Sequence, residues 1–185
     1  MPEDYIAQLR RLSSSKKVVA IGEIGLDYAF DPAYDRVTQE RCFREQLTLA
    51  SELGLPVVIH NREADEDMLR ILNETRPQGV IHRIFSALDY SREFIKLGIH
   101  MGIGPQITYP NGDCLRDLVR EMPLELLVLE TDAPFLPPYP LAGQGASPTM
   151  ISYVAEAIAE ARGGITAQQV IDIASANSRR LFKLQ

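Results

Sequence analysis

Five short apolar runs recur along this chain, each of the length of a strand rather than a helix. Val, Ile and Leu dominate them, so side chains on both faces of each strand would be apolar. Such runs are typical of parallel strands whose two faces are both covered, and they predict a buried parallel sheet. The runs are VVAIG at 18–22, LPVVI at 55–59, GVI at 79–81, the stretch 98–103, and LLVLE at 126–130.

Segments of helical periodicity separate these runs. The segment 35–54 places Phe43 and Leu47 on one face, four residues apart, and the segments 65–73 and 91–97 repeat this kind of spacing. Regular alternation of strand and helix is typical of βαβ units. The sequence therefore predicts an α/β fold.

Two more helices are expected near the end of the chain. The Ser-Pro step at 147–148 is typical of a helix start, and Thr166 with Gln169 has the form of a capping box. We therefore predict closing helices over about 148–162 and 167–175. With 185 residues and no linker or repeat, residues 1–185 are expected to form a single domain.

Composition limits the functions open to this chain. Its 45% hydrophobic and 24% charged content is that of a globular protein. The formal net charge of -6 argues against a generally basic surface for nucleic acid, so a polyanionic substrate would be held locally by metal ions or a few arginines.

The cysteines and the N-terminal segment indicate the compartment. Cys42 and Cys114 lie far apart in no metal-ligand spacing, so we expect incidental thiols of a reducing compartment. The N-terminal segment has no apolar core of signal-peptide type, and no run approaches the roughly 20 apolar residues that span a bilayer. A cytoplasmic protein without a membrane partner is expected.

Four side chains able to bind metal follow predicted strands. In a (β/α) barrel the carboxyl ends of the strands converge on one face, so residues remote in sequence can meet there. Imidazole and carboxylate suit divalent ions, and a shared carboxylate supports a two-metal hydrolytic site. Each residue alone could equally be structural, as a hydrogen-bonded histidine or a helix cap; their joint occurrence favours a site. They are Glu23, His60, His82 and Asp132.

Two further polar residues have open roles. Arg62, two residues after His60, could bind a phosphate bidentately or pair with Glu63 or Asp65. His100 lies inside the apolar stretch GIHMGIG, where a structural role away from the strand ends is favoured.

Two acidic residues near the candidate ligands also remain open. Asp27, in GEIGLDY, is expected to have a structural role in a turn rather than a catalytic one. Glu130 would point the same way as Asp132 if the strand persists, and could orient a ligand or be a buried ion-pair partner.

Several strings resemble the TatD family in the same order along the chain. They are VVAIGEIGLDY, FREQLTLASELGLPVVIHNREADEDMLRIL, GVIH followed by FSA, LVLETDAPFLPP and ASANSRRLF. GEIGLDY together with ETDAP is the most specific pair. The resemblance implies a (β/α) TIM barrel of metal-dependent hydrolases that act on DNA as deoxyribonucleases.

The resemblance also implies roles for individual residues. Glu23 would bridge two divalent ions of magnesium, manganese or zinc, and His60 and His82 would bind the second ion. Asp132 would bind the first ion and accept a proton. Glu23 and Asp132 are thus the expected catalytic residues, and DNA is the expected substrate.

The chain departs from the family pattern in three places. No Asp-x-His-x-His strand occurs, although it supplies two ligands of the first metal in the family. Because a full barrel needs about 250 residues, we expect a partial barrel without about the first three strands and an incomplete first metal site. The spacing in HRIFSA is one residue longer than usual, and GQGASP replaces the family's Arg-Asn before the Ser-Pro step.

These departures leave two alternatives to a DNA-cleaving enzyme. One is a catalytically impaired partial barrel or fragment without independent activity. The other is a related hydrolase that acts on an amide or ester, because the same metal ligands activate water for either reaction.

Overall fold

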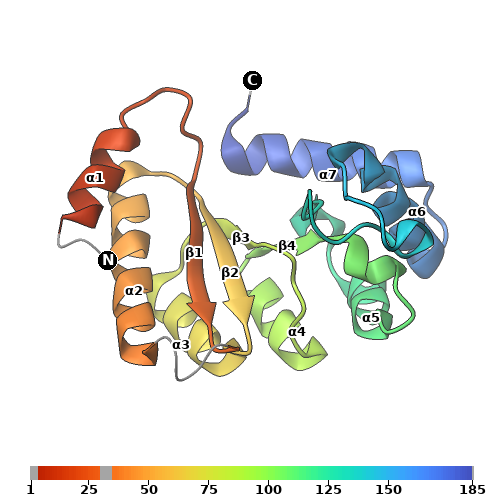
Figure 1. Cartoon of the computed structure of the whole chain (residues 1–185), viewed down its shortest axis with the longest axis horizontal. Coiled ribbons are helices and arrows are strands. Elements are labelled where there is room, and N and C mark those ends of the chain that lie inside the picture. The colour runs from red at the N-terminus through yellow and green to blue at the C-terminus, as the bar shows by residue number, and fades with distance from the viewer. Residues whose placement is uncertain (1–3, 30–34, 185) are drawn as a thin grey trace.

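The computed structural model describes residues 4–29 and 35–184 and confirms the predicted α/β fold. Five parallel strands form one open sheet, and their spatial order is the order of the chain (Figure 1). β1 and β5 are therefore the two edges of the sheet among the described residues. The strands are β1 (Ile21–Asp27), β2 (Val57–Arg62), β3 (Gly79–Ile81), β4 (His100–Ile103) and β5 (Leu127–Leu129).

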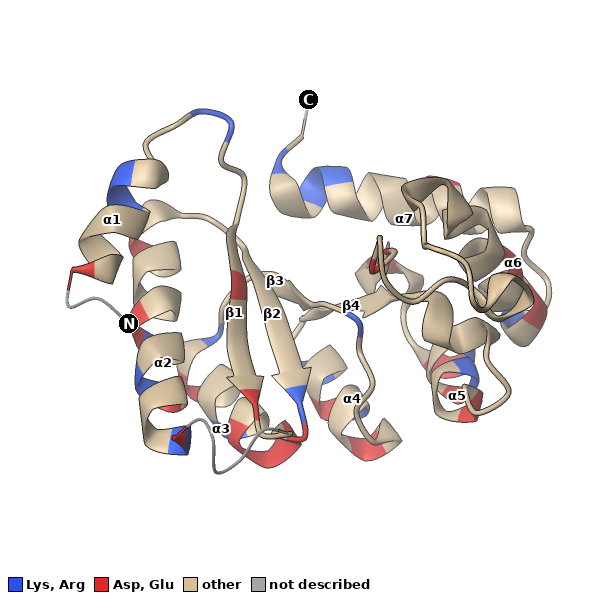
Figure 2. Ribbon diagram, viewed as in Figure 1, with Lys and Arg blue, Asp and Glu red and all other residues tan. Residues whose placement is uncertain are grey.

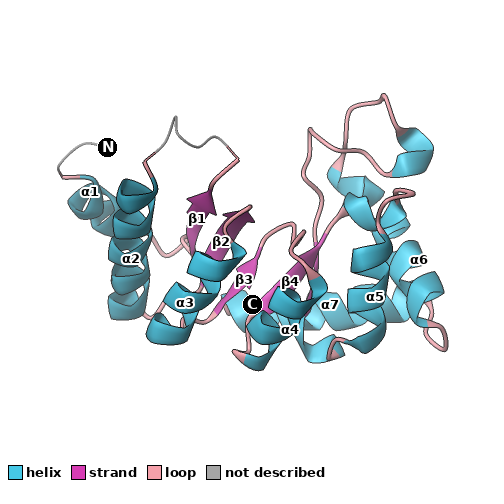
Figure 3. Cartoon of the chain, turned by 90° about the horizontal axis from the view of Figure 1, so that it is seen from below, coloured by secondary structure: helices cyan, strands magenta, loops and turns pink. Residues whose placement is uncertain are grey.

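Helices α2, α3, α4 and α5 connect successive strands and stand in a row along one face of the sheet (Figure 3). α1 lies beside α2, while α6 and α7 lie near the β5 edge (Figure 1). No helix among the described residues is both long enough and apolar enough to cross a bilayer. The helices are α1 (Tyr5–Leu12), α2 (Arg36–Leu53), α3 (Asp65–Thr75), α4 (Leu88–Lys96), α5 (Asp113–Glu121), α6 (Ile151–Arg162) and α7 (Ala167–Phe182).

Helix α2 forms as predicted. The carboxylate of Asp35 accepts hydrogen bonds from two backbone N–H groups of the first turn, one of them of Thr38. Phe43 and Leu47 are buried in the core. Gly54 ends the helix with a φ of 62°, a left-handed conformation that glycine adopts without steric cost.

Helix α7 starts at the predicted capping box but runs past the predicted end at residue 175. Thr166 and Gln169 make both hydrogen bonds of the box. The prediction of the end was wrong because the buried face continues through Asn177 and Leu181, and the polar Asn177 interrupts its apolar pattern. The predicted helix over 148–162 is confirmed, with residues Pro148–Met150 as a 3₁₀ turn before α6.

Helix α7 and the lysine after it contact the chain just before β5 and before β2. Asn177, which is 3% exposed, donates to the carbonyl oxygens of Leu124 at 2.7 Å and Leu127 at 2.8 Å. The amine of Lys183, just after the helix, donates to the carbonyl oxygen of Gly54 at 3.2 Å. The helix therefore fixes the start of β5 and reaches the loop before β2.

Helices α1 and α5 were not predicted from the sequence. α5 buries Leu115, Leu118 and Val119 at helical spacing, a pattern that the sequence does contain. α1 buries none of its residues, so it offers no apolar stripe of the kind that revealed the other helices.

Candidate metal centre

Two of the four candidate ligands lie inside strands, not after them as predicted. The expected strand at 18–22 is in fact Ile21–Asp27, which contains Glu23, and β2 continues through His60. The ladder between β1 and β2 extends to the pairs Gly25 with His60 and Asp27 with Arg62. The apolar runs overlap both strands but do not mark their ends, because the ladder continues through polar residues.

An irregularity in β1 positions Glu23 and His60. The register with β2 shifts between Ile21 and Ile24, and such a bulge turns the local side chain. Gly25, with a φ of 148°, packs directly on β2, where an added Cβ would lie 1.9 Å from the carbonyl oxygen of His60. Only glycine allows this close approach of the two strands.

His60 is held between two carboxylates of β1. Its Nδ1 lies 2.8 Å from Oε1 of Glu23, and its Nε2 lies 3.1 Å from Oδ2 of Asp27. The other carboxylate oxygen of Asp27 accepts from the backbone N–H of Ala29 at 3.1 Å. Asp27 therefore has the expected role in a turn and also contacts an imidazole, which the sequence did not reveal.

His82 follows β3 as predicted. Its Nδ1 lies 2.6 Å from Oε2 of Glu130, while its Nε2 lies 3.8 Å from Oε1 of Glu23 and 3.9 Å from Oδ1 of Asp132. The hydrogen bond with Glu130 raises the pKa of His82 above its ordinary value, although burial opposes this shift. Glu130 thus contacts a candidate ligand, one of the two roles that the sequence left open.

Asp132 lies beyond β5 and is paired with a residue that the sequence analysis missed. Nη1 of Arg83 donates to Oδ2 of Asp132 at 2.7 Å. The only signal in the sequence was the position of Arg83 directly after His82. Figure 2 shows acidic and basic residues together at the carboxyl ends of β1 and β2.

The donor set fits a divalent ion, although the side chains pair with one another in this structure. Among the described residues no three His, Cys, Asp or Glu side chains already converge as a metal cluster. Metal–donor bonds of about 2.0–2.2 Å place two donors on one ion at most about 4.4 Å apart. The 3.8 Å between Nε2 of His82 and Oε1 of Glu23, which are expected to share an ion, falls within that limit. Oδ1 of Asp132, expected at the other ion, lies 3.9 Å from the same nitrogen.

A cavity of about 610 Å³ opens beside the two imidazoles. Arg62 lines this cavity and is exposed. The carboxylate of Asp65, one of the two partners considered for Arg62, accepts from the amide of Asn61 at 2.6 Å. A separate cavity of about 550 Å³, between α5 and α6, contains none of the candidate ligands.

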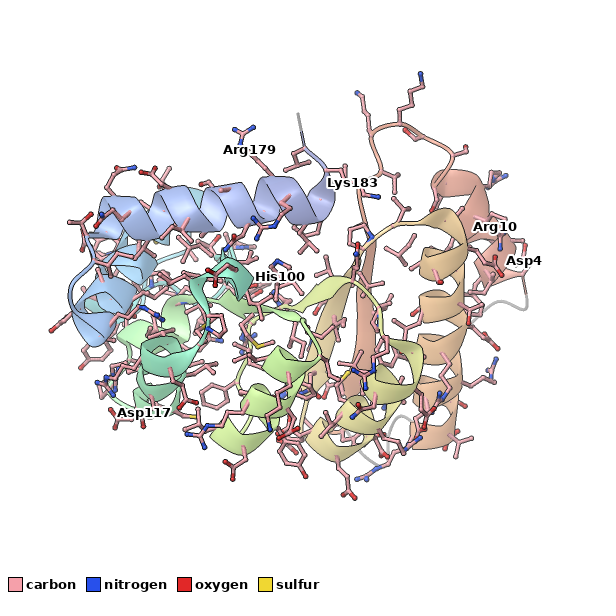
Figure 4. The ribbon with its side chains drawn as sticks, turned by 180° about the vertical axis from the view of Figure 1, so that it is seen from behind. Asp4, Arg10, His100, Asp117, Arg179 and Lys183 are labelled. Atoms are coloured by element: carbon pink, nitrogen blue, oxygen red, sulfur yellow. The ribbon has the colours of Figure 1, made fainter. Side chains whose placement is uncertain are left out.

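His100 lies at the other end of the sheet, as expected for a structural residue. It begins β4, beneath the last turns of α7, which lead to Lys183 (Figure 4). Neither ring nitrogen has a hydrogen-bond partner, and both are buried. Burial lowers the pKa of His100, and the backbone of Gly79 partly opposes this shift. It cannot contribute to a site at the carboxyl ends.

Comparison with known proteins finds relatives of this chain. The family model described as TatD related DNase matches residues 1–183. The uncharacterized metal-dependent hydrolase YabD of Bacillus subtilis (strain 168) is 38% identical over all of this chain and 72% of its own length. The Deoxyribonuclease Tat-D of Schizosaccharomyces pombe is 37% identical over 72% of this chain and 45% of its own length.

The fold agrees as well. The crystal structure of YjjV, a TatD homolog from Escherichia coli k12, superposes with a TM-score of 0.91 at 32% identity, covering 100% of this chain and 72% of that one. This superposition supports the predicted TIM-barrel type of fold. The absence of about the first three strands stays a prediction. This chain belongs to the TatD related DNase family of metal-dependent hydrolases.

Proposed function

We propose that this chain is a divalent-metal-dependent hydrolase that cleaves phosphodiester bonds of DNA, removing nucleotides from a 3′ end. The observation that carries the proposal is the position of Nε2 of His82, which faces carboxylates from β1 and from the loop after β5, 3.8 Å and 3.9 Å away. The relative from Schizosaccharomyces pombe, named Deoxyribonuclease Tat-D, supports DNA as the substrate class.

Glu23, His60 and His82 are the residues proposed to hold metal, with Glu23 shared between two ions and Asp132 at the first ion. Bound magnesium, manganese or zinc would polarise the phosphoryl group and activate water. Asp132 would accept the proton of that water. Arg62, at the cavity, would bind a substrate phosphate through two parallel hydrogen bonds.

Glu130 prepares His82 for this role. A carboxylate that accepts from Nδ1–H leaves the lone pair of Nε2 available to a ligand, and it fixes the plane of the ring. Nε2 is the atom that faces Glu23 and Asp132. The contact therefore supports metal binding through Nε2 rather than Nδ1.

The test is the metal content of the 185-residue chain after dialysis against trace zinc and manganese. We expect about one tightly bound ion, lost in Glu23→Ala. Retention of no ion by the parent chain would contradict the proposal and favour the impaired partial barrel, because the first site has no histidine from an Asp-x-His-x-His strand.

Substrate is tested separately. A single-stranded oligonucleotide labelled at its 5′ end should shorten stepwise with added magnesium, manganese or zinc, and Asp132→Asn should abolish the shortening. If the metal-loaded chain left DNA intact but cleaved a model ester or amide, the hydrolase would stand and the DNA substrate would not.

A further inference from the structure

Two side chains beside the candidate metal centre have buried polar atoms without a hydrogen-bond partner. Gln106 is 9% exposed, and neither its Oε1 nor its Nε2 has a hydrogen-bond partner. The same holds for Oε1 of Glu130, whose other oxygen contacts His82. Because buried polar groups in folded proteins are nearly always paired, two such groups in neighbouring positions call for a common explanation.

The side chains of Gln106 and Glu130 both lie next to Gly104, just after β4. An added Cβ at Gly104 would lie 2.8 Å from Oε1 of Glu130 and 3.0 Å from Oε1 of Gln106. An added Cβ at Gly102 would lie 3.1 Å from Oε2 of Glu130. The two glycines thus leave room for the carboxylate, and the amide reaches the same side of Gly104.

The backbone holds Gln106 in place. It lies in the 3₁₀ turn Pro105–Thr108, directly after β4, and its carbonyl oxygen accepts from the N–H of Tyr109 at 3.1 Å. The proline restricts the backbone at the start of the turn. The position of the amide is therefore set by a short, hydrogen-bonded segment that follows a strand of the sheet.

We propose that Gln106 is a positioning residue of the metal centre, whose amide N–H donates to Oε1 of Glu130 directly or through one water. The two ends of a side-chain amide have nearly the same shape, so a half-turn brings Nε2 to the place of Oε1. Glu130 would then be held at both oxygens, by Gln106 and by Nδ1 of His82.

This hydrogen bond gives a partner to Nε2 of Gln106 and to Oε1 of Glu130 and leaves only Oε1 of Gln106 without one. Gln106 also lines the cavity, but its amide atoms are buried beneath that surface. We therefore assign the amide to Glu130 rather than to substrate. The consequence for metal binding rests on the proposed function of His82, whereas the hydrogen bond itself does not.

Unfolding of the metal-free protein tests the hydrogen bond. Gln106→Met keeps the length of the side chain and removes its polar atoms. We expect a lower melting temperature, because Oε1 of Glu130 loses its donor. In the Glu130→Met background the same change should cost less or raise the melting temperature, since Gln106 then has no acceptor to lose.

An equal cost in both backgrounds, or a higher melting temperature in the parent background, would overturn the proposal. Gln168→Met is the matched control. Gln168 is exposed on α7 and donates to Asp172 at 2.9 Å, so its replacement should leave the melting temperature nearly unchanged.

Zinc affinity, measured by competition with a chromophoric chelator, tests the consequence. Gln106→Met should weaken zinc binding by about tenfold, the effect expected when a residue that orients a metal ligand is lost. A raised KM with unchanged zinc affinity would show instead that Gln106 contacts substrate, and would overturn the proposal. If the parent chain bound no zinc, the proposed function would fail, while the unfolding comparison would still decide the hydrogen bond.

Discussion

A partly buried imidazole lies at each end of the parallel strands, His82 at the carboxyl ends and His100 at the amino ends, and the surroundings of the two rings differ. At the carboxyl end, His82 contacts Glu130, and its pKa is raised. At the amino end, His100 has no hydrogen-bond partner, and its pKa is lowered by burial and by the nearby charge of Arg180. The same residue type on neighbouring strands is thus a candidate ligand in one place and a buried structural residue in the other.

The difference arises from the charged groups around each ring. Glu23 and Asp27 of β1, with Glu130 and Asp132 after β5, contact or face the imidazoles of His60 and His82. The amino ends are covered by α7 near His100 (Figure 4). A histidine is therefore informative about metal binding only together with the end of the sheet that it faces.

The largest effect should come from the carboxyl end. Glu23→Gln keeps the shape of the side chain but removes the charge proposed to bridge two ions. We expect hydrolysis of the labelled oligonucleotide to fall on the order of 100-fold or more, beyond the loss typical of residues that only orient ligands. His100→Leu should leave the rate within about twofold of the parent, since it alters no polar contact of the site. A comparable loss in both variants would break the comparison.

Stability should respond most at the amino end. Asn177→Leu removes the amide that donates to the carbonyl oxygens of Leu124 and Leu127, so both oxygens lose a hydrogen bond. We expect the free energy of unfolding of the metal-free protein to fall by about 2–3 kcal/mol. Denaturant titration measures it, with Gln168→Leu on the exposed side of α7 as the control. No loss of stability would mean that the two hydrogen bonds of Asn177 do not help to hold α7.

Arg62 should affect substrate binding rather than the chemical step. Arg62→Met removes the guanidinium from the cavity, and a lost charged hydrogen bond to phosphate should raise KM about tenfold with kcat little changed. Arg179→Met, on α7 at the amino end, should change neither constant (Figure 4). Steady-state kinetics with the oligonucleotide distinguishes the two. A fall in kcat alone would argue against a phosphate-binding role.

The smallest effects concern pH, and they have opposite signs at the two ends. The folded protein binds a proton at His82 more tightly than the unfolded chain, so this stabilisation is present below the ordinary pKa of 6.5 and is lost as the pH rises through the raised pKa. His100 has a lowered pKa, so stability is lost as the pH falls below 6.5.

Melting temperatures of the metal-free protein across this pH range separate the two histidines. His82→Gln should flatten the profile above pH 6.5, and His100→Leu should flatten it below that value. Unchanged profiles in both variants would show that other groups dominate the pH dependence.

The sequence predicted the arrangement of the sheet better than the contacts of the site. Apolar runs are local patterns, so they indicated the number and order of the strands, and His82 was correctly placed after β3. The first run was placed too early, because β1 is Ile21–Asp27 rather than 18–22. The extension of β2 through His60 depends on hydrogen bonds to β1, which no local pattern contains.

The partners of the candidate ligands lie far away in sequence, and no local pattern shows which residues pair. Arg83 meets Asp132 across 49 positions, and His82 meets Glu130 across 48. Gln106 stands in an apolar stretch and looks like an ordinary turn residue until its burial is known. Charge and residue type indicated candidates, but only the fold shows which of them are in contact.

The order of the strands has a consequence for synthesis on the ribosome. Each of β2 to β5 pairs with the strand made just before it, so each pairing can form as soon as that strand emerges. α7 is made after all five strands, yet the lysine after it donates to Gly54, 129 residues earlier. The contact between α7 and the loop before β2 can therefore form only after the whole of this sheet has been made.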